Sequence, residues 1–223
     1  MSDSFSVVIF DLDGTLIDSN GAWKQIDIDY AKSFGVTLSD EEANAAAAMT
    51  YDVLLKFLNT KGISITESEL CKSINKMAYD SYARTIPAKK NASSLVKSVK
   101  QSGAKVALCT GTPAELHVPT LERLGIMDCF DIRISTDMVG GIPKSRPDAL
   151  LRTISELDVP PQSCIMLDDS PDALRVAAAM GVYTVAVYDA YTNISESEYL
   201  SVCDRYVSVL PENAAQLSRI CSR

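Results

Sequence analysis

Short apolar runs and amphipathic stretches follow one another along most of the chain. The first run, residues 6–10 (SVVIF), is followed at once by Asp11, Asp13 and Gly14. An apolar run of about five residues that ends in carboxylates and glycine predicts a buried strand opening into a loop. The alternative at these residues is a strand followed by the Asp-Gly turn of a hairpin.

Between about residues 20 and 86 the pattern becomes helical. Leu70, Ile74 and Met77 recur near one face at the helical period, and Gly35 and Gly62 are typical stop signals. No strand is evident in this part of the chain. We expect helices over residues 22–34, 40–48, 51–61 and 67–83.

From about residue 90 onward, helical and strand patterns alternate. We expect strands over residues 105–109, 130–134, 164–167, 182–187 and, more weakly, 206–209. The helices between and after them are expected over residues 93–101, 114–124, 147–157, 171–180 and about 213–220. Such alternation predicts right-handed βαβ units. The fold class is therefore α/β, a Rossmann-like parallel sheet with helices on both faces plus an inserted all-helical domain.

The helical block interrupts the α/β pattern after its first strand. We expect residues 1–17 and 88–223 to form the α/β core and residues 18–87 to form the inserted domain. A helical unit hinged beside a site can cover it, exclude water and select substrates. The alternative is that these helices pack as the rigid edge of one domain.

Composition narrows the classes of partner. Of the 223 residues 47% are hydrophobic and 22% charged, with a net charge of -8, so no basic surface for nucleic acid or an anionic membrane is indicated. The six cysteines lack C-x-x-C spacing, which argues against a zinc site or a disulfide framework, and we expect most to be buried thiols. No stretch approaches the ~20 apolar residues that span a bilayer, and the N-terminal residues lack a signal-peptide pattern. We expect a cytoplasmic monomer.

Polar side chains follow the later strands as well. Thr110 comes directly after residues 105–109, and Asp168 and Asp169 come directly after residues 164–167. Because ligands bind beyond the carboxyl ends of parallel strands, we expect these groups to meet the first acidic pair in one crevice. A Thr-Gly-Thr-Pro segment is by itself also compatible with a plain turn.

Four carboxylates in one crevice need a cation. Two of them 4 Å apart repel by roughly 4 kcal/mol at an effective dielectric near 20. Oxygen ligands select a hard ion, which predicts Mg²⁺. Lys144, within the stiff segment GGIPKSRPD at residues 140–148, is a candidate for neutralising phosphate and carboxylates, the alternative being a solvated surface lysine.

Together these residues resemble a known family. DLDGT at residues 11–15, Thr110, Lys144 before RPD, and the Asp pair at 168–169 occur in the order typical of the haloacid dehalogenase-like hydrolase superfamily. The helical insertion is similar to the α-helical cap of that superfamily. The resemblance covers essentially the whole chain and is greatest to the phosphatases and phosphomutases grouped around phosphoglycolate phosphatase and β-phosphoglucomutase.

The resemblance implies a role for each catalytic residue. Asp11 would be the nucleophile that becomes aspartyl-phosphate. Asp13 would protonate the leaving oxygen and later activate water. Thr110 and Lys144 would hold the phosphoryl group.

It also implies the metal ligands. Asp11, Asp169 and the backbone carbonyl of Asp13 would bind Mg²⁺, and Asp168 would support the ion directly or through water. A dehalogenase has no comparable use for the second acid or for the ion. These residues therefore favour phosphate chemistry over halide displacement.

The sequence departs from the family pattern in three places. Gly111 stands where Asn often follows the Thr, which removes a side-chain donor. Pro143 precedes Lys144 where Gly is common, so the loop can differ in shape. The segment AMTYDVL at residues 48–54 lacks the Gly and Arg typical of the mutases.

We therefore expect a magnesium-dependent phosphatase acting on a small phosphorylated metabolite through an aspartyl-phosphate. The alternatives are a sugar-phosphate mutase similar to β-phosphoglucomutase, and a signalling module that binds phosphate without turnover. Receivers, the usual signalling modules with such acids, are shorter and place the acidic pair after the first strand.

A few other residues invite a functional role, but a structural role is the simpler expectation. His117, the only histidine, follows the Thr-Gly-Thr loop, and nothing in the sequence pairs with it. Trp23, Lys24 and Tyr51 could contact substrate, and the alternative is that they belong to the interior or solvated face of the helical domain. Cys109 is expected to be a buried apolar residue rather than a reactive thiol.

Overall fold

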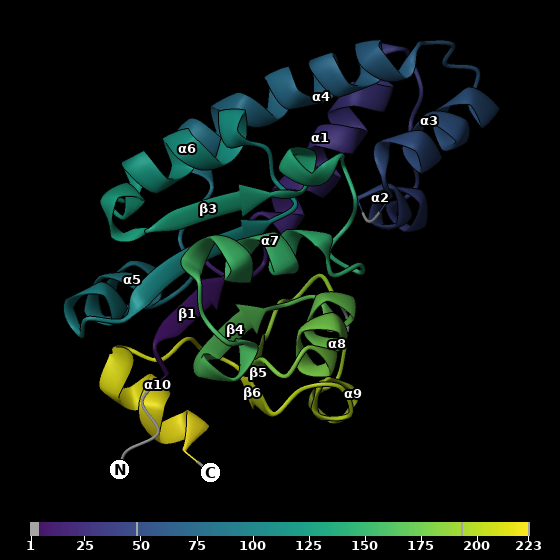
Figure 1. The fold of residues 1–223 in the computed structure, drawn as a ribbon. Coiled ribbons are helices and arrows are strands. Elements are labelled where there is room, and N and C mark those ends of the chain that lie inside the picture. Colours follow the sequence, from purple (N-terminus) through teal and green to yellow (C-terminus); the bar gives the residue numbers. More distant parts are fainter. Residues whose placement is uncertain (1–4, 48, 193, 223) are drawn as a thin grey trace. The chain divides into compact units, whose positions relative to one another are not determined.

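The computed structural model describes residues 5–47, 49–192 and 194–222 (Figure 1). Its contacts divide the chain into two compact units, a core unit of Met1–Asp18 and Pro87–Arg223 and a helical unit of Ser19–Ile86. The boundaries expected from the sequence differ from these by one residue at each junction. The role of the helical unit as a cap stays a prediction.

The core unit is built on a six-stranded sheet with the strand order β3-β2-β1-β4-β5-β6 (Figure 1). The strands are β1 Val7–Phe10, β2 Lys105–Thr110, β3 Ile132–Ser135, β4 Cys164–Asp168, β5 Tyr183–Val187 and β6 Arg205–Val207. All neighbouring pairs are parallel, and the central strand β1 pairs with both β2 and β4. The predicted parallel α/β sheet is confirmed, and the hairpin alternative after β1 is wrong.

Helices follow the strands along the chain in the core unit. They are α5 Ala92–Gln101, α6 Ala114–Arg123, α7 Asp148–Leu157, α8 Pro171–Ala179, α9 Glu196–Leu200 and α10 Ala214–Cys221. Val7 and Ile9 share one face of β1, where they belong to the same apolar cluster as Leu150 of α7 and Ala173 of α8. Helix α5 packs against β2, and α10 packs against α5. The continuous apolar character of β1 is what a strand buried on both faces requires.

The helical unit contains α1 Asn20–Ser33, α2 Asp40–Ala46, α3 Tyr51–Thr60, α4 Glu67–Asp80 and a π-helical turn, η1, at Ser81–Thr85. Helix α1 packs against α2 and α4, and α3 packs against α4. Capping boxes begin two of these helices, Ser39 with Glu42 at α2 and Thr66 with Glu69 at α4. Each box satisfies two N-terminal N–H groups of its helix.

Most differences from the expected elements lie at their ends. Helix α9 has no counterpart in the sequence pattern, because it is only five residues long. The helix expected over residues 67–83 is divided into α4 and the π-helical turn η1. The helix expected over residues 40–48 ends at Ala46, and Ala48 lies outside the described residues. All six cysteines are free thiols, and three of them, Cys109, Cys164 and Cys221, are buried.

Candidate active site

The register of the sheet brings two of the predicted acids together. Phe10 of β1 lies opposite Leu167 of β4, so the next residues, Asp11 and Asp168, are neighbours at the carboxyl ends of these strands. The backbone N–H of Asp11 donates to the Leu167 carbonyl at 3.0 Å, which extends the pairing by one residue. Two acids far apart in the sequence are thereby fixed by the backbone itself.

Asp169 completes a group of three buried carboxylates. One oxygen from each of Asp11, Asp168 and Asp169 lies within 4.8 Å of the others. The hydroxyl of Thr15 donates to Asp169 Oδ1 at 3.4 Å, and the hydroxyl of Tyr199 donates to its backbone carbonyl at 2.6 Å. The sequence-predicted acids at residues 11, 168 and 169 therefore lie at one place.

Lys144 is the cation of this group. Its Nζ lies 2.5 Å from Asp11 Oδ1 and 2.7 Å from Asp168 Oδ2, and its side chain is only 15% exposed. The loop that carries it begins with Gly140 and Gly141, whose φ angles of 78° and 75° are in the left-handed region that favours glycine. The alternative that Lys144 is a solvated surface lysine is wrong.

Burial and neighbouring negative charges raise the pKa values of Asp11 and Asp169, and a bound cation would oppose this rise. Burial raises the pKa of Asp11 well above its ordinary value; Lys144 opposes this rise, and the charges of Asp168 and Asp169 add to it. Burial and the charge of Asp168 raise the pKa of Asp169 to about 7. For Lys144 burial favours the neutral amine, but Asp11 and Asp168 outweigh it and raise its pKa well above the ordinary value. One ammonium therefore does not neutralise three buried carboxylates.

The donor set fits a hard divalent cation such as Mg²⁺. Carboxylate oxygens from Asp11, Asp168 and Asp169 are close enough to share one ion. Asp168 already accepts hydrogen bonds on both oxygens, from the Ser170 N–H to Oδ1 and from Lys144 to Oδ2. Lys144 also donates to Asp11 Oδ1, and Thr15 donates to Asp169 Oδ1, so each carboxylate of the group is held by at least one donor.

Asp13 stands beside this group rather than in it. Its Oδ2 accepts a hydrogen bond from the hydroxyl of Thr112, a residue of the loop after β2. Gly14 follows Asp13 with a φ of 72°, a conformation that turns the chain directly after the second acid. The side chain of Asp13 is thus held separately from the carboxylates that could bind an ion.

Thr110 is the last residue of β2 and is fully buried. Its hydroxyl oxygen accepts a hydrogen bond from the Thr112 N–H at 3.1 Å. This contact folds the Thr-Gly-Thr segment back on itself at the same edge of the sheet. Its side-chain hydrogen stays available to a further acceptor.

Several side chains near the site were not predicted. Thr112 and Tyr199 contact Asp13 and Asp169, and Lys89 forms a 2.8 Å ion pair with the buried Asp189 directly beyond β5. The position of Asp189 just after a strand is the signal that could have found it. Tyr199 follows no strand end, so no comparable signal marks it.

The residues of the helical unit that could contact substrate have partners within that unit. Trp23 Nε1 donates to the Tyr82 hydroxyl at 2.7 Å, and Lys24 forms an exposed ion pair with Asp40. The hydroxyl of Tyr51 donates to an Asn75 oxygen at 2.7 Å. These contacts fit the structural interpretation of the three side chains.

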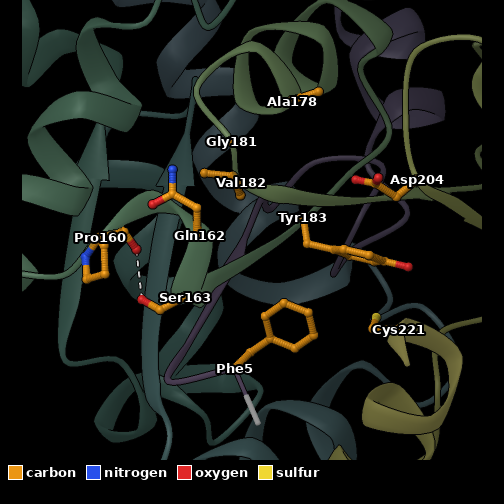
Figure 2. A pocket seen from close by; sticks show the side chains of 10 residues that line it. All are labelled: Phe5, Pro160, Gln162, Ser163, Ala178, Gly181, Val182, Tyr183, Asp204 and Cys221. Atoms are coloured by element: carbon orange, nitrogen blue, oxygen red, sulfur yellow. Dashed lines mark hydrogen bonds between the residues drawn. The ribbon is translucent and has the colours of Figure 1, made fainter. Parts of the chain in front are cut away.

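A pocket of about 630 Å³ lies at the other end of the sheet, where the strands begin (Figure 2). Figure 2 shows the rings of Phe5 and Tyr183 in this pocket, and their centroids are 5.4 Å apart. Gln162 and Asp204 line the pocket, and none of the predicted site residues does. The pocket is therefore distinct from the carboxylate group.

None of the helices that the structure describes combines the length and apolar character needed to cross a bilayer.

Comparisons with known proteins agree with this geometry. A family model described as haloacid dehalogenase-like hydrolase matches residues 5–181. The chain is 27% identical to phosphoglycolate phosphatase from Pseudomonas fluorescens, over 95% of this chain and 82% of that protein. It is 23% identical to a phosphorylated carbohydrates phosphatase from Thermotoga maritima, over 92% of this chain and 94% of that protein.

Solved structures show the same fold. The structure of CbbY from Rhodobacter sphaeroides in complex with phosphate superposes with a TM-score of 0.78 at 21% identity, covering 92% of this chain and 94% of that one. At this level of identity the likeness extends to the fold and no further.

Proposed function

Since the chain belongs to the haloacid dehalogenase-like hydrolase family, we propose that this phosphoric monoester hydrolase is magnesium-dependent and cleaves small phosphorylated metabolites through an aspartyl-phosphate. The observation that carries the proposal is the buried group of Asp11, Asp168 and Asp169 with Lys144 bridging two of its members. Phosphoryl transfer depends on positioning and on charge stabilisation, and this group supplies both.

The proposed first step is attack by a carboxylate oxygen of Asp11 on phosphorus. The bond between phosphorus and the ester oxygen breaks, and Asp13 donates a proton to that oxygen so that it leaves as an alcohol. Lys144 and Thr110 hold the phosphoryl oxygens during the transfer. An aspartyl-phosphate on Asp11 and a free alcohol result.

The proposed second step returns the enzyme to its starting state. Asp13, now ionised, takes a proton from a water molecule that attacks the phosphorus of the aspartyl-phosphate. Inorganic phosphate leaves, and the carboxylate of Asp11 is restored. Asp11, Asp169 and the Asp13 carbonyl, with Asp168 in support, would hold Mg²⁺, which would supply the charge that lets an anionic nucleophile approach an anionic ester.

The relatives support small phosphorylated metabolites as the proposed substrate class. Those named above act on phosphoglycolate and on phosphorylated carbohydrates, so short phosphorylated acids and sugars are the first substrates to test. A mutase is less favoured, because the segment at residues 48–54 lacks the Gly and Arg typical of that group.

We further propose that the protein is a cytoplasmic monomer, which size-exclusion chromatography and fractionation of cells would test.

The decisive experiment measures phosphate release from acid, sugar and nucleoside monophosphates with Mg²⁺. We expect Asp11→Asn to abolish turnover with the fold retained by circular dichroism, and Asp13→Asn to slow turnover strongly while leaving metal binding. We also expect activity to disappear in excess chelator and to return with Mg²⁺. A near-normal rate for either variant, or full activity in chelator, would overturn the mechanism, and isomerisation of a sugar phosphate without release would favour the mutase.

A further inference from the structure

We propose that Thr112 and His117 are positioning residues for Asp13. The imidazole of His117 holds the backbone of Thr112, and the hydroxyl of Thr112 in turn holds the carboxylate that protonates the leaving group. This inference rests on the phosphatase reaction proposed above and assigns two further residues to it. Neither residue belongs to the four segments on which the family resemblance rests.

The contacts form a continuous chain from helix α6 to the loop after β1. His117 Nδ1 lies 2.9 Å from the carbonyl oxygen of Thr112, and the Thr112 hydroxyl donates to Asp13 Oδ2. Thr112 and His117 are only 6% and 3% exposed, so water competes little for either hydrogen bond. Asp13, in the loop after β1, is therefore contacted from the loop after β2.

The loop between β2 and α6 is fixed at each of its residues. The Thr112 N–H donates to Thr110 Oγ1 at 3.1 Å, and the hydroxyl of Thr136 donates to the Gly111 carbonyl at 3.2 Å. His117 then binds the next carbonyl along the loop, that of Thr112. With three side chains holding its backbone, the loop presents the Thr112 hydroxyl at a defined place.

The role of His117 follows from the chemistry of its partner. A carbonyl oxygen only accepts hydrogen bonds, so Nδ1 must carry a hydrogen. Burial lowers the pKa of His117; its bond to Thr112 and the charges of Asp137 and Asp13 oppose the fall, whereas Arg133 adds to it. His117 is thus a neutral donor near pH 7, suited to holding a loop rather than to exchanging protons.

The hydrogen bond also distinguishes the two oxygens of Asp13. While the Thr112 hydroxyl donates to Oδ2, that oxygen binds a proton less well, so the hydrogen bond favours Oδ1 as the oxygen that carries the proton. Removing the hydroxyl would remove this difference between the two oxygens and would spread the proton over both. In kcat/KM, which reports the first step, the predicted loss therefore falls on esters whose leaving oxygen needs a proton.

The test compares two esters that differ in this need. An alkyl phosphate has a poor leaving group that requires protonation, whereas p-nitrophenyl phosphate releases a stable anion. We expect Thr112→Val, which keeps the shape but not the hydroxyl, to lower kcat/KM for the alkyl ester roughly 10- to 100-fold, a part of the 10²–10⁴ that general acid catalysis supplies. For p-nitrophenyl phosphate we expect a change of less than about threefold.

Matched variants separate positioning from simple loss of structure. Thr112→Ser retains the hydroxyl and should restore the alkyl ester rate. His117→Asn places an amide N–H near the position of Nδ1 and should act like the wild type, whereas His117→Leu should lower the alkyl ester rate selectively. If circular dichroism shows that Thr112→Val is unfolded, His117→Asn and His117→Leu test the positioning role instead, by the ratio of the alkyl ester rate to the p-nitrophenyl phosphate rate.

Three results would contradict the inference. Equal losses for both esters would mean that Thr112 binds the phosphoryl group, and failure of Thr112→Ser to recover would mean that the hydroxyl is not what matters. His117→Leu with wild-type rates on both esters would remove His117 from the proposal. A wild-type protein inactive on every monoester would instead overturn the phosphatase function itself, which the same assay reports separately.

Discussion

Replacing Lys144 by methionine removes the charge that holds two buried carboxylates while keeping most of the volume. At an effective dielectric near 20, distances of 2.5 and 2.7 Å to Asp11 and Asp168 correspond to attractions of roughly 6–7 kcal/mol each. The desolvation of each ion, several kcal/mol, opposes them. Breaking a buried pair by removing one partner costs about 3–5 kcal/mol, because the other charge stays buried.

We therefore expect Lys144→Met to lose about 3–5 kcal/mol of unfolding free energy in the presence of chelator. At about 2–4 °C for each kcal/mol, the melting temperature should fall by roughly 6–20 °C. Mg²⁺ should restore a large part of this loss, because a divalent cation can neutralise Asp11, Asp168 and Asp169. The Mg²⁺ concentration at the midpoint of stabilisation should be lower than in the wild type, since a competing positive charge is gone.

The chain offers a matched control. Lys100 Nζ also lies 2.5 Å from a carboxylate oxygen, that of Asp131, but these side chains are 39% and 31% exposed. Lys100→Met should lose no more than about 1 kcal/mol, as is typical of solvent-screened pairs. The stability of the wild type and of both variants is measured by thermal and urea unfolding, with chelator and along a series of Mg²⁺ concentrations. Equal losses for the two variants, or a Mg²⁺ midpoint unchanged by Lys144→Met, would refute the electrostatic reasoning.

Three further predictions concern residues that do not belong to the carboxylate group. Burial raises the pKa of Asp27 from 3.8 to about 7, so the folded state keeps this proton between about pH 4 and 7 while the unfolded state loses it. Stability should fall as the pH rises through that window, by at most about 4 kcal/mol, and Asp27→Asn should remove the fall in urea unfolding at pH 5 and 8. Ile9→Ala, in the fully buried β1, should cost about 2–5 kcal/mol and Ile9→Val about 0.5–1.5 kcal/mol; an exposed-site cost for the alanine variant would contradict the packing. Burial raises the pKa of Cys109 to about 11, so a thiol reagent should modify it far more slowly than the partly exposed Cys71, as mass spectrometry of labelled peptides would show.

Local signals in the sequence were enough to predict the sheet and the place of the site. A run such as VVIF at residues 7–10 can only be buried, and carboxylates directly after it must lie at the carboxyl end of the strand. The same reasoning applied to residues 164–169 predicted that Asp11 and Asp168 would meet, and the register of β1 and β4 brings them side by side. Both conclusions depend on the fact that parallel strands begin and end at common edges.

The sequence did not predict which side chains contact one another within the site. The sequence offered no partner for His117, yet it binds the Thr112 carbonyl, and Thr112 contacts Asp13 from the loop after β2. Tyr199 likewise holds the backbone of Asp169 from a five-residue helix that no periodicity marks. Such contacts depend on loop geometry and rotamers, which arise only when the whole unit has packed.

By itself the sequence determined the strands and the longer helices, because continuous apolar runs mark buried strands and the helical period marks amphipathic helices. It also determined that acids, a threonine and a lysine follow those strands, and hence what chemistry to expect. Only the tertiary structure decided that Lys144 lies between Asp11 and Asp168 rather than in solvent, and that a hydroxyl from the loop after β2 binds Asp13. The physical reason is that hydrogen bonds and ion pairs act over a few ångströms, and separation along the chain does not show which side chains come that close in the folded protein.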